Sequence, residues 1–117
     1  MPITSYKQLT VWQKSFELVR QVYVLTEKLP KHEQFGLSNQ IRRCAVSIPS
    51  NIAEGQQRHS RKEYLQFLAI ARGSAAELDT QLLLIESIYG LDCEKELSLL
   101  DEVQRMLTVL TNKLSAL

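Results

Sequence analysis

The sequence contains few residues that interrupt regular structure. Its 117 residues include only three prolines and four glycines. Few turns can form, so the elements between them should be long. No apolar run approaches the roughly 18 residues that a membrane-spanning helix needs, and residues 1–6 lack the basic and apolar segments of a secretory signal. The sequence therefore predicts a cytoplasmic protein that has no membrane partner.

Cysteine is scarce as well, and the residue patterns of catalytic sites are missing. Cys44 and Cys93 lie far apart and form no Cys-x-x-Cys pair, so we expect free thiols in a reducing compartment. His32 and His59 have no partner at metal-ligand spacing, and the Glu-x-x-His pairs of di-iron bundles do not occur. The sequence has no glycine-rich phosphate loop. It predicts no enzyme, no metal site and no cofactor.

Apolar residues recur at helical spacing over most of the chain. Thr10 and Ser60 each open a capping box, Pro30 should end the first helix, and Gly90 and Asp92 should close the third and open the fourth. Short connections favour antiparallel neighbours. The fold class is therefore all-α, an antiparallel up-down-up-down four-helix bundle in a single domain, residues 1–117. The predicted helices cover about residues 10–29, 37–57, 60–89 and 92–116.

The second predicted helix carries a proline in the middle of its apolar pattern. Pro49 has no amide hydrogen for the carbonyl of Ala45, which costs about 3 kcal/mol or more in a helix interior. We therefore predict a kink at Pro49. Ser47, Ser50 and Asn51 are the side chains able to satisfy the freed backbone groups.

The third predicted helix carries more apolar surface than one bundle core needs. Beside its heptad series runs a series of small residues that includes Gly73. Glycine costs about 1 kcal/mol against alanine in a helix, so Gly73 indicates either close approach by a neighbouring helix or an exposed, tolerated position. Surplus apolar surface favours assembly with other copies of the chain. The candidate interface residues are Phe67, Ile70, Gly73, Leu84 and Ile88.

Charge is polarised, although the formal net charge is only +1. Basic residues gather between positions 38 and 62, and acids between positions 77 and 104. We expect one basic spot at the turn between the second and third helices, and another in mid-bundle where Arg72 returns beside Arg42 and Arg43. Such spots bind phosphates, or else they are solvated and pair with the acids of a neighbouring subunit. The candidate nucleic-acid-binding residues are Arg42, Arg43, Arg58, His59, Arg61, Lys62 and Arg72.

Four stretches of the sequence match a known pattern. They are LTVWQK at 9–14, EQFGLSNQIRR at 33–43, SIPSNIAEG at 47–55 and RHSRKEYLQFLAIARGSAAEL at 58–78. Together they resemble the four-helix-bundle family named for 23S rRNA intervening sequences, and SIPSNIAEG is the most specific of them. Phe35 and Cys44 are mild departures, since the family usually has a tyrosine and a small residue there.

The resemblance implies a bacterial four-helix bundle that assembles as a ring-shaped homopentamer. It also implies no catalytic residues and a molecular role that is not established. Similar proteins that accompany diversity-generating retroelements are strongly basic nucleic-acid binders that contact a reverse transcriptase. This chain, at +1, is less basic than they are.

These observations predict a non-enzymatic, homo-oligomeric binding module that contacts RNA or DNA through its basic half. The residue pattern by itself supports an assembly of more than one chain, and the number five comes from the resemblance. The alternative is an oligomeric scaffold for a protein partner that binds no nucleic acid.

Overall fold

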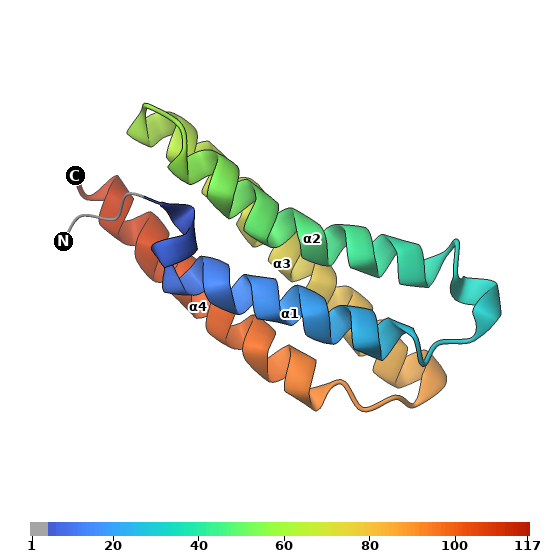
Figure 1. The fold of residues 1–117 in the computed structure, drawn as a ribbon. Coiled ribbons are helices and arrows are strands. Elements are labelled where there is room, and N and C mark those ends of the chain that lie inside the picture. Colours follow the sequence, from blue (N-terminus) through green and yellow to red (C-terminus); the bar gives the residue numbers. More distant parts are fainter. Residues whose placement is uncertain (1–4) are drawn as a thin grey trace.

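The computed structural model describes residues 5–117, and over this range the chain is all-α and forms no strand. The first four residues, which belong to the stretch inspected for a secretory signal, lie outside the described residues. Four long helices form a bundle whose principal extents are 46 × 23 × 21 Å (Figure 1). The elements are η1 (Tyr6–Gln8), α1 (Thr10–Thr26), η2 (Lys31–Glu33), α2 (Leu37–Gln56), α3 (Arg61–Tyr89) and α4 (Glu94–Ser115).

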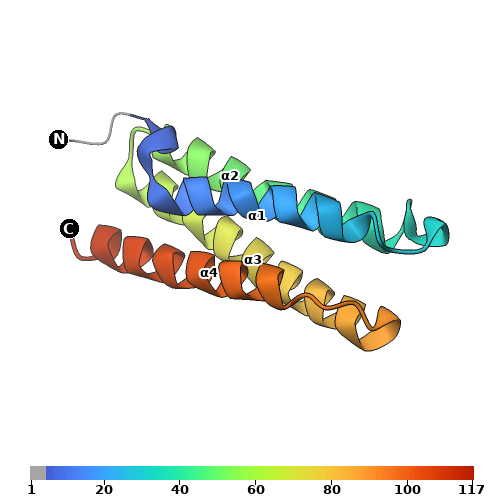
Figure 2. The same ribbon diagram turned by 60° about the horizontal axis from the view of Figure 1, so that its bottom comes forward.

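The helices contact one another in a cycle. α2 packs against α1 and α3, and α4 packs against α3 and α1. Figures 1 and 2 show the α1–α2 and α3–α4 connections at one end of the bundle, which we call the loop end. The α2–α3 turn, the start of α1 and the end of α4 lie at the opposite end, which we call the turn end.

The core consists of the apolar positions that recur at helical spacing in the sequence. Each helix turns one apolar stripe inward, where burial removes it from water. The largest side chains that are fully buried are Leu18, Val22, Ile41, Ile48, Ile52, Leu68, Leu78, Leu82, Ile85, Leu100, Val103 and Leu107. Across the described chain, none of the helices is both long enough and apolar enough to cross a bilayer.

The helix starts differ in part from the predicted ones. The capping box predicted at Thr10 is wrong, because the N-cap of α1 is Leu9 and makes no side-chain bond. The box forms one element earlier, where Ser5 N–H donates to Gln8 Oε1 at 3.3 Å. Gln13 is the residue that would have completed a box at Thr10. Its side-chain amide instead donates to the Lys7 carbonyl at 2.8 Å and connects α1 to η1.

The other helix ends follow the predictions more closely. The Ser60 hydroxyl accepts from Glu63 N–H at 3.1 Å, and Gly90 ends α3 in the left-handed conformation with φ of 68°. The predicted end of the first helix at residue 29, before Pro30, is wrong, because α1 ends at Thr26 and a turn that contains Leu29 follows it. The N-cap of α4 is Cys93, one residue later than the predicted Asp92, although the Asp92 carboxylate still accepts from Glu94 N–H at 2.9 Å.

Among the four glycines, Gly55 has the least space for a side chain. A Cβ atom there would lie 2.8 Å from Phe67 Cβ and 3.0 Å from Tyr64 Cδ1, so α3 packs directly on the α2 backbone. At Gly73 a Cβ atom would meet nothing within 4 Å. Gly73 was predicted either to lie at a close approach of another helix or to be exposed and tolerated. Within residues 5–117 it is exposed.

Candidate nucleic-acid interface

The turn end carries a cluster of exposed basic side chains. The Arg58 guanidinium pairs with Glu54 at 2.7 Å and lies 4.8 Å above the centre of the Phe67 ring. Arg61 donates to the Leu117 carbonyl, which joins the start of α3 to the end of the chain. The four side chains predicted for this spot, Arg58, His59, Arg61 and Lys62, are all exposed and belong to the α2–α3 turn and the first turn of α3.

The predicted mid-bundle spot is divided between two grooves. Arg42 is half-buried, with Nε donating to Thr26 Oγ1 at 2.7 Å and its guanidinium 4.6 Å above the Tyr23 ring. It therefore serves mainly as a tie between α1 and α2. Arg43 is exposed, and both arginines line a hollow of about 520 Å³ between α1 and α2.

Arg72 lies in a different place from Arg42 and Arg43. It lines a groove of about 450 Å³ with Gln104 and Thr108 of α4. Its rotation around the α3 axis decides this, because Ser74 and Glu77 occupy the side of α3 that faces α2. The sequence spacing indicated how far along the bundle Arg72 lies. It did not indicate which side of α3 carries Arg72, and that side determines which groove the residue lines.

The two ends of the bundle differ in charge. The basic residues of the turn end are Lys7, Arg58, Arg61, Lys62 and Lys113, beside the acids Glu54 and Glu63. The acids of the loop end are Glu27, Glu33, Glu86, Asp92, Glu94 and Glu96, beside Lys28, Lys31 and Lys95. The polarity seen along the sequence thus becomes a polarity from end to end, because the acidic connections fold back to one end.

Polar side chains form hydrogen bonds on both sides of Pro49 in the sequence of α2, where Pro49 is buried. The Asn51 amide donates to the Ser47 carbonyl at 2.7 Å, and the Ser47 hydroxyl donates to the Cys44 carbonyl at 2.6 Å. The Ser47 hydroxyl also lies 2.7 Å from Ser74 Oγ. These bonds reach the carbonyls of Cys44 and Ser47 and not that of Ala45, so the predicted bond to the freed Ala45 carbonyl is not seen among the described residues. The Ser47–Ser74 contact also links α2 to α3.

A hydrogen-bonded cluster at the loop end had no signal in the helical pattern. The Tyr89 hydroxyl donates to the Glu33 carboxylate, which lowers the pKa of Glu33 and raises that of Tyr89. Glu33 also accepts from Leu37 N–H at 3.3 Å, at the start of α2. His32 Nε2 lies 3.3 Å from the Tyr89 oxygen. The cluster fastens the α1–α2 connection to the end of α3.

Both cysteines are buried free thiols. Cys44 donates to the Ser74 carbonyl at 3.1 Å, and burial, with Glu77 nearby, raises its pKa from 9.0 to about 12. Burial and the Glu86 carboxylate raise the pKa of Cys93 to about 11. Neither is an activated nucleophile. Within residues 5–117, no three metal-ligating side chains gather as a metal site would require.

The Cys44 thiol should make stability depend on alkaline pH. The folded state holds this proton more tightly than the unfolded state, so its contribution is complete below about pH 9 and is lost as pH rises toward about 12. Urea unfolding at about pH 8 and about pH 10.5 should therefore show a smaller loss of stability for Cys44→Ala than for the unaltered chain. Equal losses would contradict this assignment.

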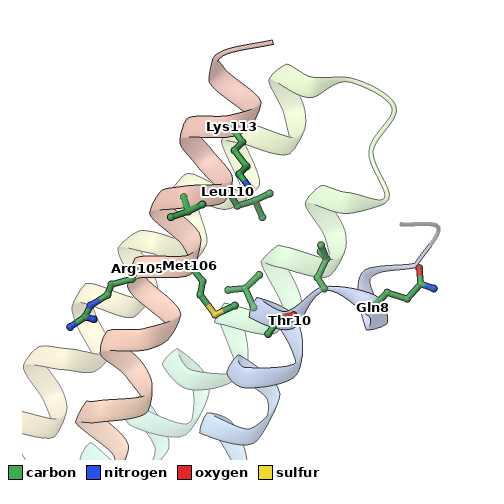
Figure 3. A pocket seen from close by; sticks show the side chains of 9 residues that line it. Gln8, Thr10, Arg105, Met106, Leu110 and Lys113 are labelled. Atoms are coloured by element: carbon green, nitrogen blue, oxygen red, sulfur yellow. The ribbon is translucent and has the colours of Figure 1, made fainter. Parts of the chain in front are cut away.

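An apolar hollow lies between the start of α1 and the end of α4. Its volume is about 390 Å³, and it is lined mainly by Leu9, Val11, Met106, Val109 and Leu110. Figure 3 shows Met106 reaching toward the start of α1, while Arg105 points away. Helical spacing did not predict this hollow; the one sign of it is Val109, which lies beside the apolar stripe of α4 and is exposed.

A protein-family model described as 23S rRNA-intervening sequence protein matches residues 7–112. The chain belongs to this family. A solved structure from Bacteroides thetaiotaomicron, a protein with unknown function from the S23 ribosomal protein family, is 27% identical and superposes with a TM-score of 0.78. The match covers 87% of this chain and 95% of that one. No curated protein matches the sequence.

This 23S rRNA-intervening sequence protein keeps most of its candidate interface residues at the surface. Ile70, Leu84 and Ile88 of α3 are 52%, 43% and 61% exposed. Gly73 is exposed beside them, whereas Phe67 is half-buried beneath Arg58. The Bacteroides protein and this chain thus share the fold, and among residues 5–117 of this chain apolar side chains of α3 remain exposed.

Proposed function

We propose that this protein is a non-enzymatic, homo-oligomeric binding module of the cytoplasm that binds RNA through its turn end. Its framework is an antiparallel up-down-up-down bundle in which α2 bends at Pro49. Five copies form the assembly. The partners are therefore other copies of the chain and a nucleic acid.

The charge difference between the two ends carries the RNA proposal. Exposed arginine and lysine side chains at the turn end attract phosphates, whereas the acids of the loop end repel them. In a ring, the turn ends of several chains lie close together, which multiplies a basic cluster that is small in one chain. A net charge of +1 then does not prevent binding.

A salt titration with a structured RNA hairpin tests the proposal. We expect affinity to fall steeply between about 50 mM and about 200 mM salt, because each phosphate contact releases counterions. A chain that shows no binding at the lowest salt contradicts RNA binding. That outcome leaves the scaffold for a protein partner, which the apolar hollow beside Met106 supports.

The bend in α2 has its own test. Pro49→Ala restores one helix hydrogen bond and removes a helix-breaking residue, yet it straightens α2 and alters the packing of a buried position. We expect a lower melting temperature or loss of the oligomer, measured by circular dichroism and light scattering. A clearly more stable variant with unchanged assembly means that the bend has no role in the assembly.

A further inference from the structure

Two apolar surfaces of the bundle have no partner among residues 5–117, the part of the chain that the structure describes. The first, which we call the α1–α2 groove, is a hollow of about 340 Å³ whose wall includes Trp12, Phe16, Val46 and Pro49. Phe16 is 50% exposed and Val46 is 39% exposed. The groove continues past Val46 toward Arg43, where the hollow of about 520 Å³ begins.

The second surface, which we call the α3 ridge, contains Ile70, Gly73, Glu77, Leu84 and Ile88. Ile70, Glu77 and Leu84 are seven residues apart, so they share one face of the helix. That face is the one beside α2, because Glu77 Oε2 lies 3.5 Å from Cys44 Sγ. The empty space above Gly73 makes a low point in the ridge where another chain can approach closely.

Residues of the groove and of the ridge can be paired by their heights along the bundle. Ser47 contacts Ser74, and Gly55 contacts Phe67. These contacts show which residues of α2 and α3 lie at the same distance along the bundle. By this measure Ile70 lies at the height of Asn51, between Ser50 and Ala53 of the groove wall.

Two further pairs follow from the same measure. Glu77 lies at the height of Arg43, so an acid of the ridge matches a base of the groove. Leu84 lies at the height of Phe35, which is 87% exposed at the loop end. Copies related by rotation without rise about an axis along the bundle bring equal heights together.

The positions of the two surfaces favour a closed ring. The groove opens between α1 and α2, and the ridge lies on α3 just beyond α2, so they occupy neighbouring faces of the bundle. A head-to-tail contact between neighbouring faces turns at every copy and closes on itself. Surfaces on opposite faces would extend into a filament instead.

We propose that the α3 ridge of each chain packs into the α1–α2 groove of the next copy. Ile70 lies against Ser50 and Ala53, and Glu77 lies beside Arg43. This inference rests on the proposed homo-oligomer and names the two surfaces that form it. Since the surfaces differ, every chain gives its ridge to one neighbour and its groove to the other.

Charged substitutions on each surface test the inference by light scattering. Ile70→Glu damages the ridge alone, and Val46→Glu damages the groove alone. We expect each variant to sediment and scatter as a single chain of 13.4 kDa. Leu83→Glu is the matched control, because Leu83 is 50% exposed on the same helix and Ile70 is 52% exposed. The control should keep the mass of the unaltered assembly, and circular dichroism should show all three folded.

Mixing the two damaged variants decides whether the surfaces meet each other. The Ile70→Glu variant keeps an intact groove, and the Val46→Glu variant keeps an intact ridge. One intact contact can therefore form between one chain of each variant. We expect a species of twice the single-chain mass in the mixture and in neither variant alone. A mixture that stays monomeric overturns the inference.

The remaining outcomes separate this inference from the proposed function. An unaltered chain that is monomeric removes the oligomer and this interface with it. An unaltered oligomer that survives Ile70→Glu or Val46→Glu, or is lost with Leu83→Glu, overturns the interface and leaves the oligomer standing. If Val46→Glu keeps the oligomer but loses RNA binding, the groove holds RNA and the inference is wrong.

Discussion

Replacing Gly55 by alanine should lower the free energy of unfolding by about 2 kcal/mol. Alanine is the better helix former by about 1 kcal/mol, so the sign of the effect depends on packing. The added Cβ would lie 2.8 Å from Phe67 Cβ and 3.3 Å from the Tyr64 carbonyl oxygen. Neither is the free end of a flexible side chain, so α2 and α3 must move apart. Urea unfolding measures the change as a lower midpoint at constant slope.

Gly73→Ala is the control for that substitution. It makes the same change in a helix interior, but the added Cβ meets nothing within 4 Å. The isolated chain should therefore gain about 1 kcal/mol from the better helix propensity. If both glycine variants change stability in the same direction, packing at Gly55 is not what sets its effect. The comparison uses protein diluted to the monomer, because Gly73 belongs to the proposed ridge.

Lys62→Glu should weaken the binding of a structured RNA hairpin by about tenfold and lower the slope of affinity against salt by about one. Lys62 is exposed in the first turn of α3, at the turn end. Reversing its charge removes an attraction to phosphate and adds a repulsion. The fold should tolerate the change, because an acid in a first turn complements the helix dipole.

Lys95→Glu provides a close match for the Lys62 variant. Lys95 is also exposed at the second position of a helix, α4, but it lies at the loop end. The net charge of the chain changes equally in both variants. RNA affinity should change less than about twofold for Lys95→Glu. Equal losses for the two variants mean that RNA responds to total charge and that the turn end is not the site.

The residues of the turn-end cluster could be predicted from the sequence because they are neighbours in it. Arg58, His59, Arg61 and Lys62 flank a turn whose start signal, Ser60 with Glu63, is local. Any fold that keeps this turn exposes them together. Arg72 belonged to the same prediction but lies in another groove, because its position depends on which side of α3 faces α4.

The sequence by itself determined the four helices, their approximate ends and their buried faces. Apolar spacing, caps and turn residues act within a few neighbours, so each helix encodes its own core stripe. This accounts for the buried positions from Leu18 to Leu107 and for the left-handed cap at Gly90.

Only the tertiary structure decided which glycine lies at a close approach and which surfaces remain open. A helix encodes its polar and apolar sides, but the distance between two helices follows from both sequences at once. Gly55 packs on Phe67 because their heights coincide, whereas Gly73 faces open space. The bond from Tyr89 to Glu33, and the groove that joins Trp12 to Pro49, likewise arise where segments far apart in the chain meet.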